Sequence, residues 1–188
     1  MKTRGILRLI VSNFAAALIA ISILIPVPAN AAHELIYAVD VNNNLVSFWS
    51  DTPDNFVSAL SINGLQLNEE IRGLDAWEGI LYGLGSSSRL YKIDPATGLA
   101  TQIGAGQFSP ILNGQTFGFD SGGPTGLRVV SALTQNLLID HTTGIAMAGP
   151  TNHYVLGDIN YGAIPRVDGL AYDMYTGQWL VTDTSKNI

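Results

Sequence analysis

The sequence predicts an all-β fold made of β-propeller-like repeats, each about 45 residues long and folded as a four-stranded antiparallel blade. Three observations support this prediction. A short strand motif recurs with offsets of 45, 46 and 52 residues. Apolar and polar residues alternate with a period of two inside the repeats, as half-buried strands require. Charged residues make up only 13% of the chain, and turn-forming Gly, Asn, Thr and Ser are plentiful. The copies of the motif lie at residues 36–40, 81–85, 127–131 and 179–183.

Before the repeats, the chain has the three regions of a secretory signal peptide. They are the basic residues Lys2, Arg4 and Arg8, the apolar residues 9–27, and the small-x-small site Ala29-Asn30-Ala31. We expect residues 1–31 to be removed and residues 32–188 to form a single repeat domain. A transmembrane anchor is the alternative, because the apolar run is just long enough to span a bilayer.

The expected mature chain is acidic and has no cysteine. Removing the signal peptide leaves 6 basic and 15 acidic residues, a net charge of −9. This charge argues against nucleic acid or an anionic membrane as a partner, because both need a cationic face. Without disulfides, burial and strand pairing must stabilise the exported protein. We therefore expect a bacterial secreted protein, periplasmic or extracellular, with no stable membrane insertion after signal cleavage.

The repeats can be followed strand by strand. The first repeat begins at residue 35 with a second strand and lacks a first one. The second repeat is the clearest, with strands expected at residues 71–76, 80–84, 89–94 and 99–103. Its turns contain Pro, Asp, Thr and Gly, which preset φ, bond back to the backbone or adopt positive φ. The third repeat covers residues 116–148 in the same order, and the fourth supplies strands at 167–173 and 178–183.

These strands make about three and a half blades, fewer than the four that propellers usually need. We therefore expect a partial ring that is incomplete at the C-terminus, with a β-sandwich as the alternative fold. Open strand edges are expected to promote self-association. The extra sequence at residues 149–165 accounts for the longest offset, and it is expected to form a loop on one face.

Several of these motifs resemble the repeats of the domain of unknown function 4394 family. The resemblance rests on residues 81–85, 89–98, 117–120, 127–131 and 135–138. It covers about residues 34–149 and implies an exported bacterial propeller-like protein with no assigned activity and no catalytic residues to transfer. It also implies that this chain is truncated, because the match fades after Pro150 and the family's final strands are missing.

The inserted loop holds the candidate ligand-binding residues. They are His153, Tyr154, Asp158 and Tyr161. Loops inserted in repeat arrays often form the binding face, and aromatic side chains stack on sugars or grip peptides. The ligand is therefore expected to be a protein or a carbohydrate. A spacer loop without a binding role is the alternative.

Two other motifs are better explained as turns than as sites. Asp120-Ser121-Gly122-Gly123-Pro124 resembles the nucleophile loop of trypsin-like serine proteases, but His33 lies at the expected cleavage site and supplies no positioned base. Asp40-Val41-Asn42-Asn43-Asn44 partly fits a calcium loop, but Leu45 stands where that loop requires glycine.

A third motif, Asp-x-x-Thr-Gly, begins at Asp94, Asp140 and Asp173. Repeated carboxylates suggest either a cation-binding rim or capped hairpin turns, and their recurrence in every such turn favours caps. No cofactor and no metal are expected. The expected function is an exported, non-catalytic binding or scaffold module of unknown ligand. The alternative is a propeller hydrolase or lactonase with a site at the central channel.

Overall fold

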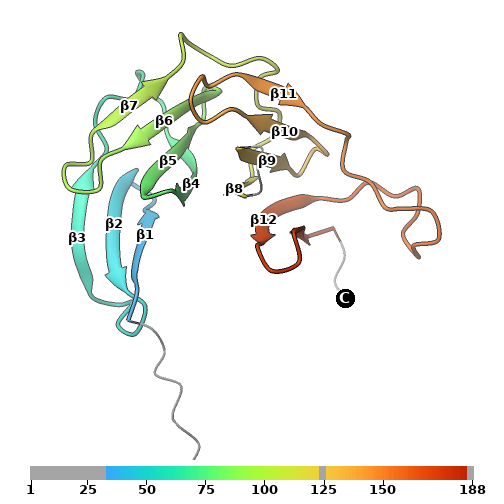
Figure 1. The fold of residues 1–188 in the computed structure, drawn as a ribbon, viewed down its shortest axis with the longest axis horizontal. Coiled ribbons are helices and arrows are strands. Elements are labelled where there is room, and N and C mark those ends of the chain that lie inside the picture. Colours follow the sequence, from blue (N-terminus) through green and yellow to red (C-terminus); the bar gives the residue numbers. More distant parts are fainter. Residues whose placement is uncertain (1–32, 123–125, 186–188) are drawn as a thin grey trace, which may run out of the picture. The chain divides into compact units, whose positions relative to one another are not determined.

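The computed structural model describes residues 33–122 and 126–185, which form strands, turns and loops (Figure 1). Within these residues there is no helix that could cross a membrane. The predicted all-β class is confirmed. The expected signal peptide and its cleavage site lie outside the described residues.

The strands form four separate antiparallel sheets, which we call blades 1 to 4 in chain order. Blade 1 contains β1 (Leu35–Val39), β2 (Asn44–Trp49) and β3 (Phe56–Ser61). Blade 2 contains β4 (Ile71–Trp77), β5 (Ile80–Gly85), β6 (Arg89–Ile93) and β7 (Ala100–Ile103). Blade 3 contains β8 (Phe117–Ser121), β9 (Leu127–Ser131), β10 (Asn136–Ile139) and β11 (Ala146–Ala148). Blade 4 contains β12 (Val167–Asp173) and β13 (Gln178–Asp183).

This arrangement confirms the predicted partial propeller. Blades 2 and 3 have the four strands expected of complete repeats, whereas blade 1 has three strands and blade 4 has two. The strands of each blade pair in sequence order. In the part of the chain that the structure describes, no sheet closes on itself and no strand of blade 4 pairs with blade 1.

The first strands of blades 2, 3 and 4 lie next to one another, with β8 packed against both β4 and β12 (Figure 1). Glycine makes this close approach possible at two matching positions. A Cβ atom added to Gly73 of β4 would lie 2.5 Å from the Cβ atom of Phe119 in the next blade. One added to Gly118 of β8 would lie 2.8 Å from the Cβ atom of Leu170. Both positions therefore exclude any side chain.

Two aspartates, each two residues beyond one of these glycines, connect the blades. Asp75 Oδ2 accepts a hydrogen bond from the backbone amide of Ser121 at 2.7 Å. Asp120 Oδ2 accepts one from the amide of Tyr172 at 2.5 Å. Each carboxylate thus binds the first strand of the following blade, and the Gly-x-Asp motif docks one blade onto the next. The matching residue of β12 is Ala171, which cannot accept a further bond.

The connections between blades are held at a second set of matching positions. Asn43, Ser88 and Thr134 occupy the turn between the second and third strands of their repeats, with φ of 61°, 63° and 65°. The Oδ1 atom of Asn43 accepts a hydrogen bond from the Ile71 amide. The Ser88 hydroxyl accepts one from the Leu112 amide. The Thr134 carbonyl accepts one from the Asn152 amide. Each of the three interblade connections, or the strand it leads into, is therefore hydrogen-bonded to the same kind of turn.

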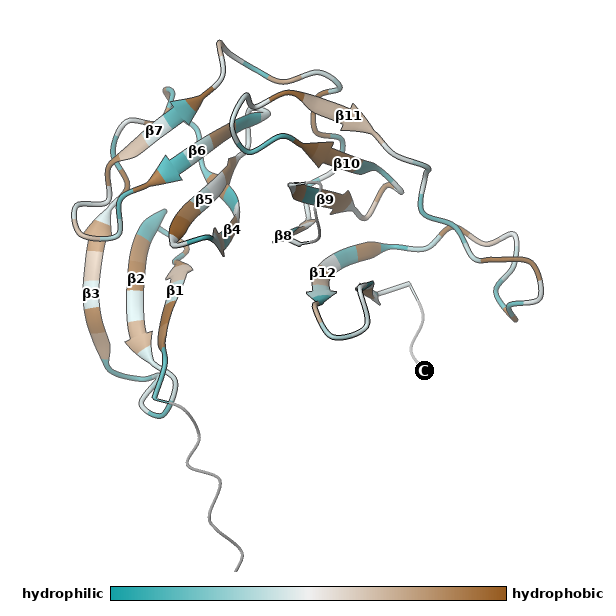
Figure 2. Cartoon of the chain, in the orientation of Figure 1, coloured by the Kyte–Doolittle hydropathy of each residue, from teal (hydrophilic) through white to brown (hydrophobic). Residues whose placement is uncertain are grey.

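Apolar burial between the sheets supplies the core. Figure 2 shows hydrophobic residues concentrated on β5, β9 and β10. One cluster joins blades 2 and 3 through buried residues such as Leu84, Leu127 and Ile139. A second cluster joins blades 1 and 2 through Leu45 and Tyr91. Each complete blade is thus stabilised mainly by contact with its neighbours, as in other repeat folds.

Candidate functional site

The loop between β11 and β12 contains the inserted sequence, and hydrogen bonds fix both of its ends. At the start, the Asn152 amide donates to the Thr134 carbonyl at 3.0 Å. At the end, the Arg166 amide donates to Asp183 Oδ1 at 3.0 Å. The Tyr154 hydroxyl also donates to the Asp183 carboxylate, and this hydrogen bond lowers the pKa of Asp183. The loop is therefore attached both to blade 3 and to blade 4.

The side chains of three of the four candidate residues make hydrogen bonds within the protein. The His153 ring lies 2.9 Å from the carbonyl oxygen of Thr151. Asp158 Oδ1 accepts a hydrogen bond from the Asn160 amide at 2.7 Å, which caps a turn. Tyr154 anchors the loop, as described above. Tyr161 is 60% exposed. The structure thus does not gather the four into one polar pocket, and their role in binding stays a prediction.

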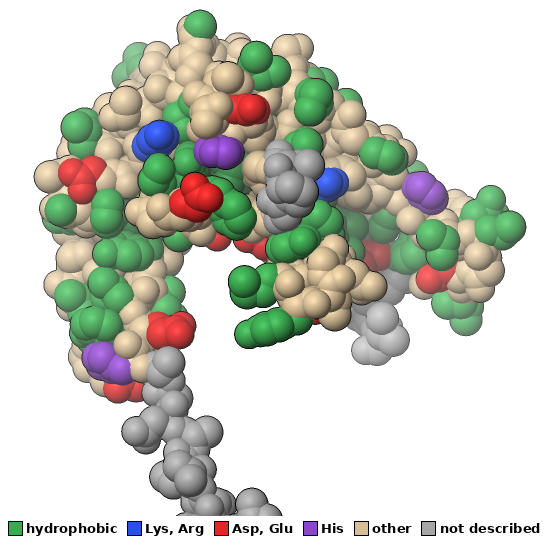
Figure 3. Space-filling view, viewed as in Figure 1, with side chains coloured by type: hydrophobic (Ala, Val, Ile, Leu, Met, Phe, Trp, Pro, Cys, Tyr) green, Lys and Arg blue, Asp and Glu red, His purple; other side chains and the backbone are tan. Residues whose placement is uncertain are grey.

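The loop instead exposes large apolar side chains, a feature that the sequence alone did not single out. Leu156 is 83% exposed and Ile159 is 98% exposed, and Val155, Tyr161 and Ile164 are also exposed. Hydrophobic atoms cluster on this loop in the space-filling view, at the right of Figure 3. We call residues 155–164 the apolar loop.

The two earlier interblade connections place their apolar residues differently. Ile62 and Leu65, between β3 and β4, pack against the core shared by blades 1 and 2. Phe108 and Leu112, between β7 and β8, belong to or pack against the core shared by blades 2 and 3. Each of these two connections also exposes one large apolar side chain, Leu67 or Ile111, whereas the third connection exposes the five named above.

A groove of about 380 Å³ lies at the base of the apolar loop. One wall is the β9–β10 turn with Leu133 and Thr134, and the other is formed by His153, Ile164 and Pro165. Leu133 and Ile164 are both exposed. The groove and the apolar loop together offer a mostly apolar contact surface with a few polar groups at its edge.

A carboxyl group with a raised pKa lies elsewhere, at the interface of blades 2 and 3. Burial, and then the adjacent charge and hydrogen bond of Asp75, raise the pKa of Asp120 to about 6, although the hydrogen bond from the Tyr172 amide opposes this. Two carboxyl groups that share a proton can serve as a catalytic dyad. Here, however, their oxygens accept backbone amides of Ser121 and Tyr172. We therefore assign the pair to blade docking.

This assignment predicts a pH dependence. Because the folded state raises the pKa of Asp120 above its ordinary value of 3.8, its protonation stabilises the fold at low pH, and that contribution is lost as the pH rises through about 6. In Asp120→Asn, the side chain stays neutral and can still accept the Tyr172 amide. The midpoint temperature of thermal unfolding, measured from about pH 4 to about pH 7, should therefore fall less with rising pH in the variant than in the wild type. Asp54→Asn, on an exposed turn, should keep the wild-type slope; equal slopes in all three proteins would contradict the assignment.

The repeated Asp-x-x-Thr-Gly motif forms capped turns, as predicted. Asp94 accepts hydrogen bonds from the Ala96 amide and the Thr97 hydroxyl. Asp173 accepts the Tyr175 amide and the Thr176 hydroxyl in the same pattern. Asp140 accepts the amides of Thr142 and Thr143 and the hydroxyl of Thr142. The Asp40 carboxylate likewise accepts the amides of Asn42 and Asn44. Within the described residues, no three His, Asp or Glu side chains are placed to hold a metal ion.

The protease-like motif also lacks a catalytic arrangement. The Ser121 hydroxyl donates to the carbonyl oxygen of Ala76 at 3.4 Å. His33 is stacked on Trp49, with ring centroids 4.1 Å apart, and bonds to Asp51. The serine and the histidine therefore have separate structural partners, and part of the motif lies among residues 123–125, outside the described residues.

The fold and its blade contacts define an all-β, partial propeller-like repeat protein. A family model described as Domain of unknown function (DUF4394) matches residues 44–182, and the chain belongs to this family. The match continues well beyond Pro150, where the resemblance was expected to fade, and it includes β12 and most of β13. The family match therefore covers most of blade 4. None of the curated proteins matches the chain.

Proposed function

We propose that this protein is an exported, non-catalytic binding or scaffold module that contacts a protein partner through the apolar loop and the groove at its base. The observation that carries the proposal is the exposure of Leu156 and Ile159 on a loop that is fixed at both ends. A loop that merely connects blades has no need of a cluster of solvent-exposed apolar side chains, and the two shorter connections pack most of theirs against the core, exposing only Leu67 and Ile111.

The chemistry of the loop favours a protein over a carbohydrate. Sugar sites combine aromatic faces with polar side chains that are free to bind hydroxyl groups. Here Tyr154 and Asp158 already bond within the protein, whereas aliphatic side chains point to solvent. Burying one such aliphatic side chain in a partner would contribute about 1.5–3 kcal/mol before the costs of association.

The absence of catalysis can be tested directly. Purified protein should contain no stoichiometric metal and should not turn over generic ester, lactone or glycoside substrates. Reproducible turnover, or one metal ion per chain, would favour the hydrolase or lactonase alternative and overturn the binding proposal.

The apolar loop should be dispensable for folding. Because Leu156 and Ile159 are almost fully exposed, the double variant Leu156→Ser/Ile159→Ser should change the free energy of unfolding by less than about 0.5 kcal/mol. Urea unfolding of the variant and the wild type measures this difference. A loss of about 2 kcal/mol or more would instead assign these side chains a structural role.

The proposed export of the protein leads to a separate prediction. Amino-terminal sequencing of the protein recovered from the periplasm or medium should begin at or next to Ala32, because the small-x-small site ends at Ala31. Intact Met1 in the membrane fraction would establish an anchor instead.

A further inference from the structure

A second hollow, of about 330 Å³, lies beside the groove at the base of the apolar loop. Leu133 lines both of them, and Arg166 in the hollow directly follows Pro165 in the groove. The hollow and the groove are therefore adjacent, and we call the second one the Arg166 hollow. Besides Leu133 and Arg166, it is lined by Asn113, Gly114, Gln115, Thr116 and Ala132.

The β9–β10 turn holds the walls of both the hollow and the groove in place. The Gln135 side chain donates to the carbonyl oxygen of Ile111 at 2.8 Å and accepts the Asn113 amide at 2.9 Å. The Gln135 carbonyl oxygen accepts the side-chain amide of Asn152 at 3.3 Å. One residue thus fixes a wall of the hollow and a wall of the groove. A surface that is already formed lowers the ordering cost of binding.

The polar side chains of the Arg166 hollow are free to bind a ligand. Within the part of the chain that the structure describes, the Arg166 guanidinium and the side chains of Asn113, Gln115 and Thr116 have no hydrogen-bond or ion-pair partner. Arg166 uses only its backbone, whose amide donates to Asp183. A guanidinium has five N–H donors and no acceptor, in a fork that matches a carboxylate.

The distribution of charge also favours an anionic group at this place. The chain has 15 acidic residues, yet none of the residues that line the hollow or the groove is acidic. The carboxylates of Asp168 and Asp183 bind hydroxyl and amide donors and form no ion pair with the Arg166 guanidinium. By contrast, Arg72 is paired with Glu70 at 2.8 Å. Arg166 is therefore an unpaired cation beside an apolar groove.

We propose that the groove and the Arg166 hollow together bind a peptide segment of the partner in which an apolar residue stands next to an acidic one. This inference rests on the proposed function and names the chemistry of its partner. The apolar side chain packs between Leu133 and Ile164, and the carboxylate accepts N–H donors from the Arg166 guanidinium. An acidic polysaccharide fits less well, because Leu133 and Ile164 offer it aliphatic instead of aromatic surfaces.

Selection from a random peptide library displayed on phage tests this chemistry on the purified exported protein. The selected peptides should share an apolar residue next to Asp or Glu. A synthetic copy of the most enriched peptide then serves as the probe, and fluorescence anisotropy measures its Kd. Arg166→Gln should weaken binding by at least about tenfold, because a charge-assisted hydrogen bond is lost. Leu133→Ser should also weaken it, through lost apolar contact.

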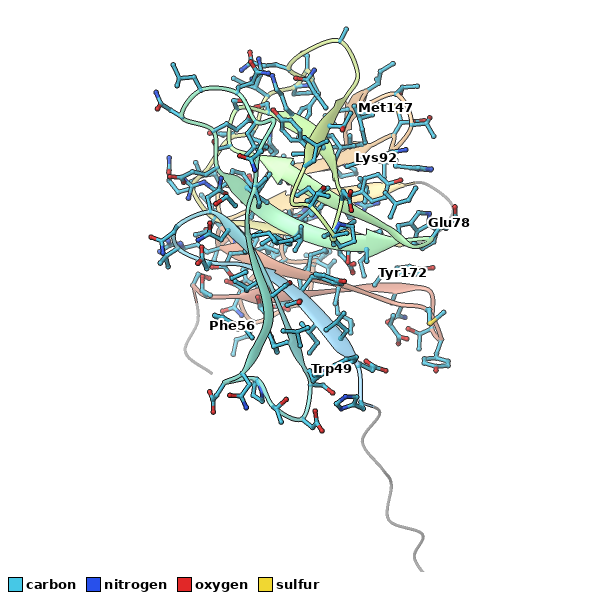
Figure 4. All side chains as sticks on the ribbon, turned by 90° about the vertical axis from the view of Figure 1, so that its left-hand side faces the viewer. Trp49, Phe56, Glu78, Lys92, Met147 and Tyr172 are labelled. Atoms are coloured by element: carbon cyan, nitrogen blue, oxygen red, sulfur yellow. The ribbon has the colours of Figure 1, made fainter. Side chains whose placement is uncertain are left out.

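Lys92→Gln is the matched control, since it removes the same charge from an exposed position on β6 (Figure 4). It should bind the peptide as the wild type does. A charge swap gives a further measurement. Arg166→Glu should bind a peptide whose acidic residue is replaced by lysine at least about ten times more tightly than the wild type does, because the ion pair is restored with its charges exchanged.

The possible failures are distinguishable. Selected peptides without an acidic residue, or equal affinities of the wild type and Arg166→Gln, would overturn the inference. If those peptides still bound more weakly to Leu133→Ser, protein binding at the groove would stand and only the role of Arg166 would fail. If the wild type enriched no peptide over Leu133→Ser, both this inference and the proposed function at the groove would be contradicted.

Discussion

Replacing Gly118 with alanine is expected to lower the free energy of unfolding by about 1–3 kcal/mol and to loosen blade 4 from blade 3. The added Cβ atom would lie 2.8 Å from the carbonyl carbon of Gly169 and from the backbone nitrogen of Leu170. Backbone atoms in a paired strand cannot move aside alone, so the whole of β12 must shift. The shift would also lengthen the hydrogen bond from the Tyr172 amide to Asp120.

Gly106→Ala is the matched control for this change. A Cβ atom added at Gly106 has no heavy atom within 4 Å, so the same methyl group enters open space. The control should alter stability by less than about 0.5 kcal/mol. Urea unfolding of both variants gives the comparison, and equal losses would show that the approach of β8 and β12 does not contribute to stability.

Replacing Glu69 with alanine is expected to destabilise the protein by roughly 3 kcal/mol or more, because the buried Tyr91 hydroxyl and three part-buried donor groups would lose their acceptor. Glu69 is only 6% exposed. Its carboxylate accepts the Tyr91 hydroxyl at 2.5 Å, the Ser87 amide at 3.2 Å and the Gln66 amide at 3.3 Å. The Ser87 hydroxyl also donates to it. Tyr91 is fully buried, so water cannot replace the lost bond.

The neighbouring residue provides the control. Glu70 is exposed and forms a surface ion pair with Arg72 at 2.8 Å, so Glu70→Ala should cost less than about 1 kcal/mol. The pH dependence gives a second check. Burial by itself raises the pKa of Glu69, but hydrogen bonds from Ser87, Tyr91 and Gln66 outweigh it and lower the pKa below its ordinary value of 4.5. The stability from Glu69 is thus present above about pH 4.5 and lost as the pH falls further. Similar losses in both variants at pH 7 would contradict this account.

The strands were predictable from the sequence because the signals that define them are local. Alternating residues such as Leu90, Lys92 and Ile93 predicted β6, and the turn beginning at Asp94 predicted where it ends. The same reasoning found blade 4 as the start of a fourth repeat. It underestimated how far the family match extends, because the inserted loop interrupts the period there.

The contacts between blades were not predictable in this way. Gly73-Leu74-Asp75 and Gly118-Phe119-Asp120 share a spacing, but a period of two does not tell which face of a strand meets another blade. Glu69 lies in a connection where a charged side chain is usually solvated, and its burial depends on donors brought from β6 and the β5–β6 turn. Both the contact at the Gly-x-Asp motif and the burial of Glu69 therefore depend on tertiary structure, which a local sequence pattern does not reveal.

At the candidate site, too, the sequence alone did not reveal which side chains are free to contact a partner. The sequence directed attention to polar and aromatic residues of the inserted loop, and the structure uses Tyr154 and Asp158 to hold that loop together. A projecting loop has few neighbours, so its own side chains must satisfy its turns and anchor its ends. The residues left for a partner are therefore Leu156 and Ile159, which periodicity alone would assign to a core.

Photocrosslinking from the apolar loop tests the proposed function most directly. A photoreactive residue placed at Ile159, in the protein exported by its native host, should give one discrete adduct with a partner protein. The same residue at Met147, which is exposed on β11, should not give that adduct. Adding Leu156→Ser should weaken the Ile159 adduct while leaving the protein folded. No adduct at Ile159, or the same adducts from both positions, would contradict the binding role of this loop.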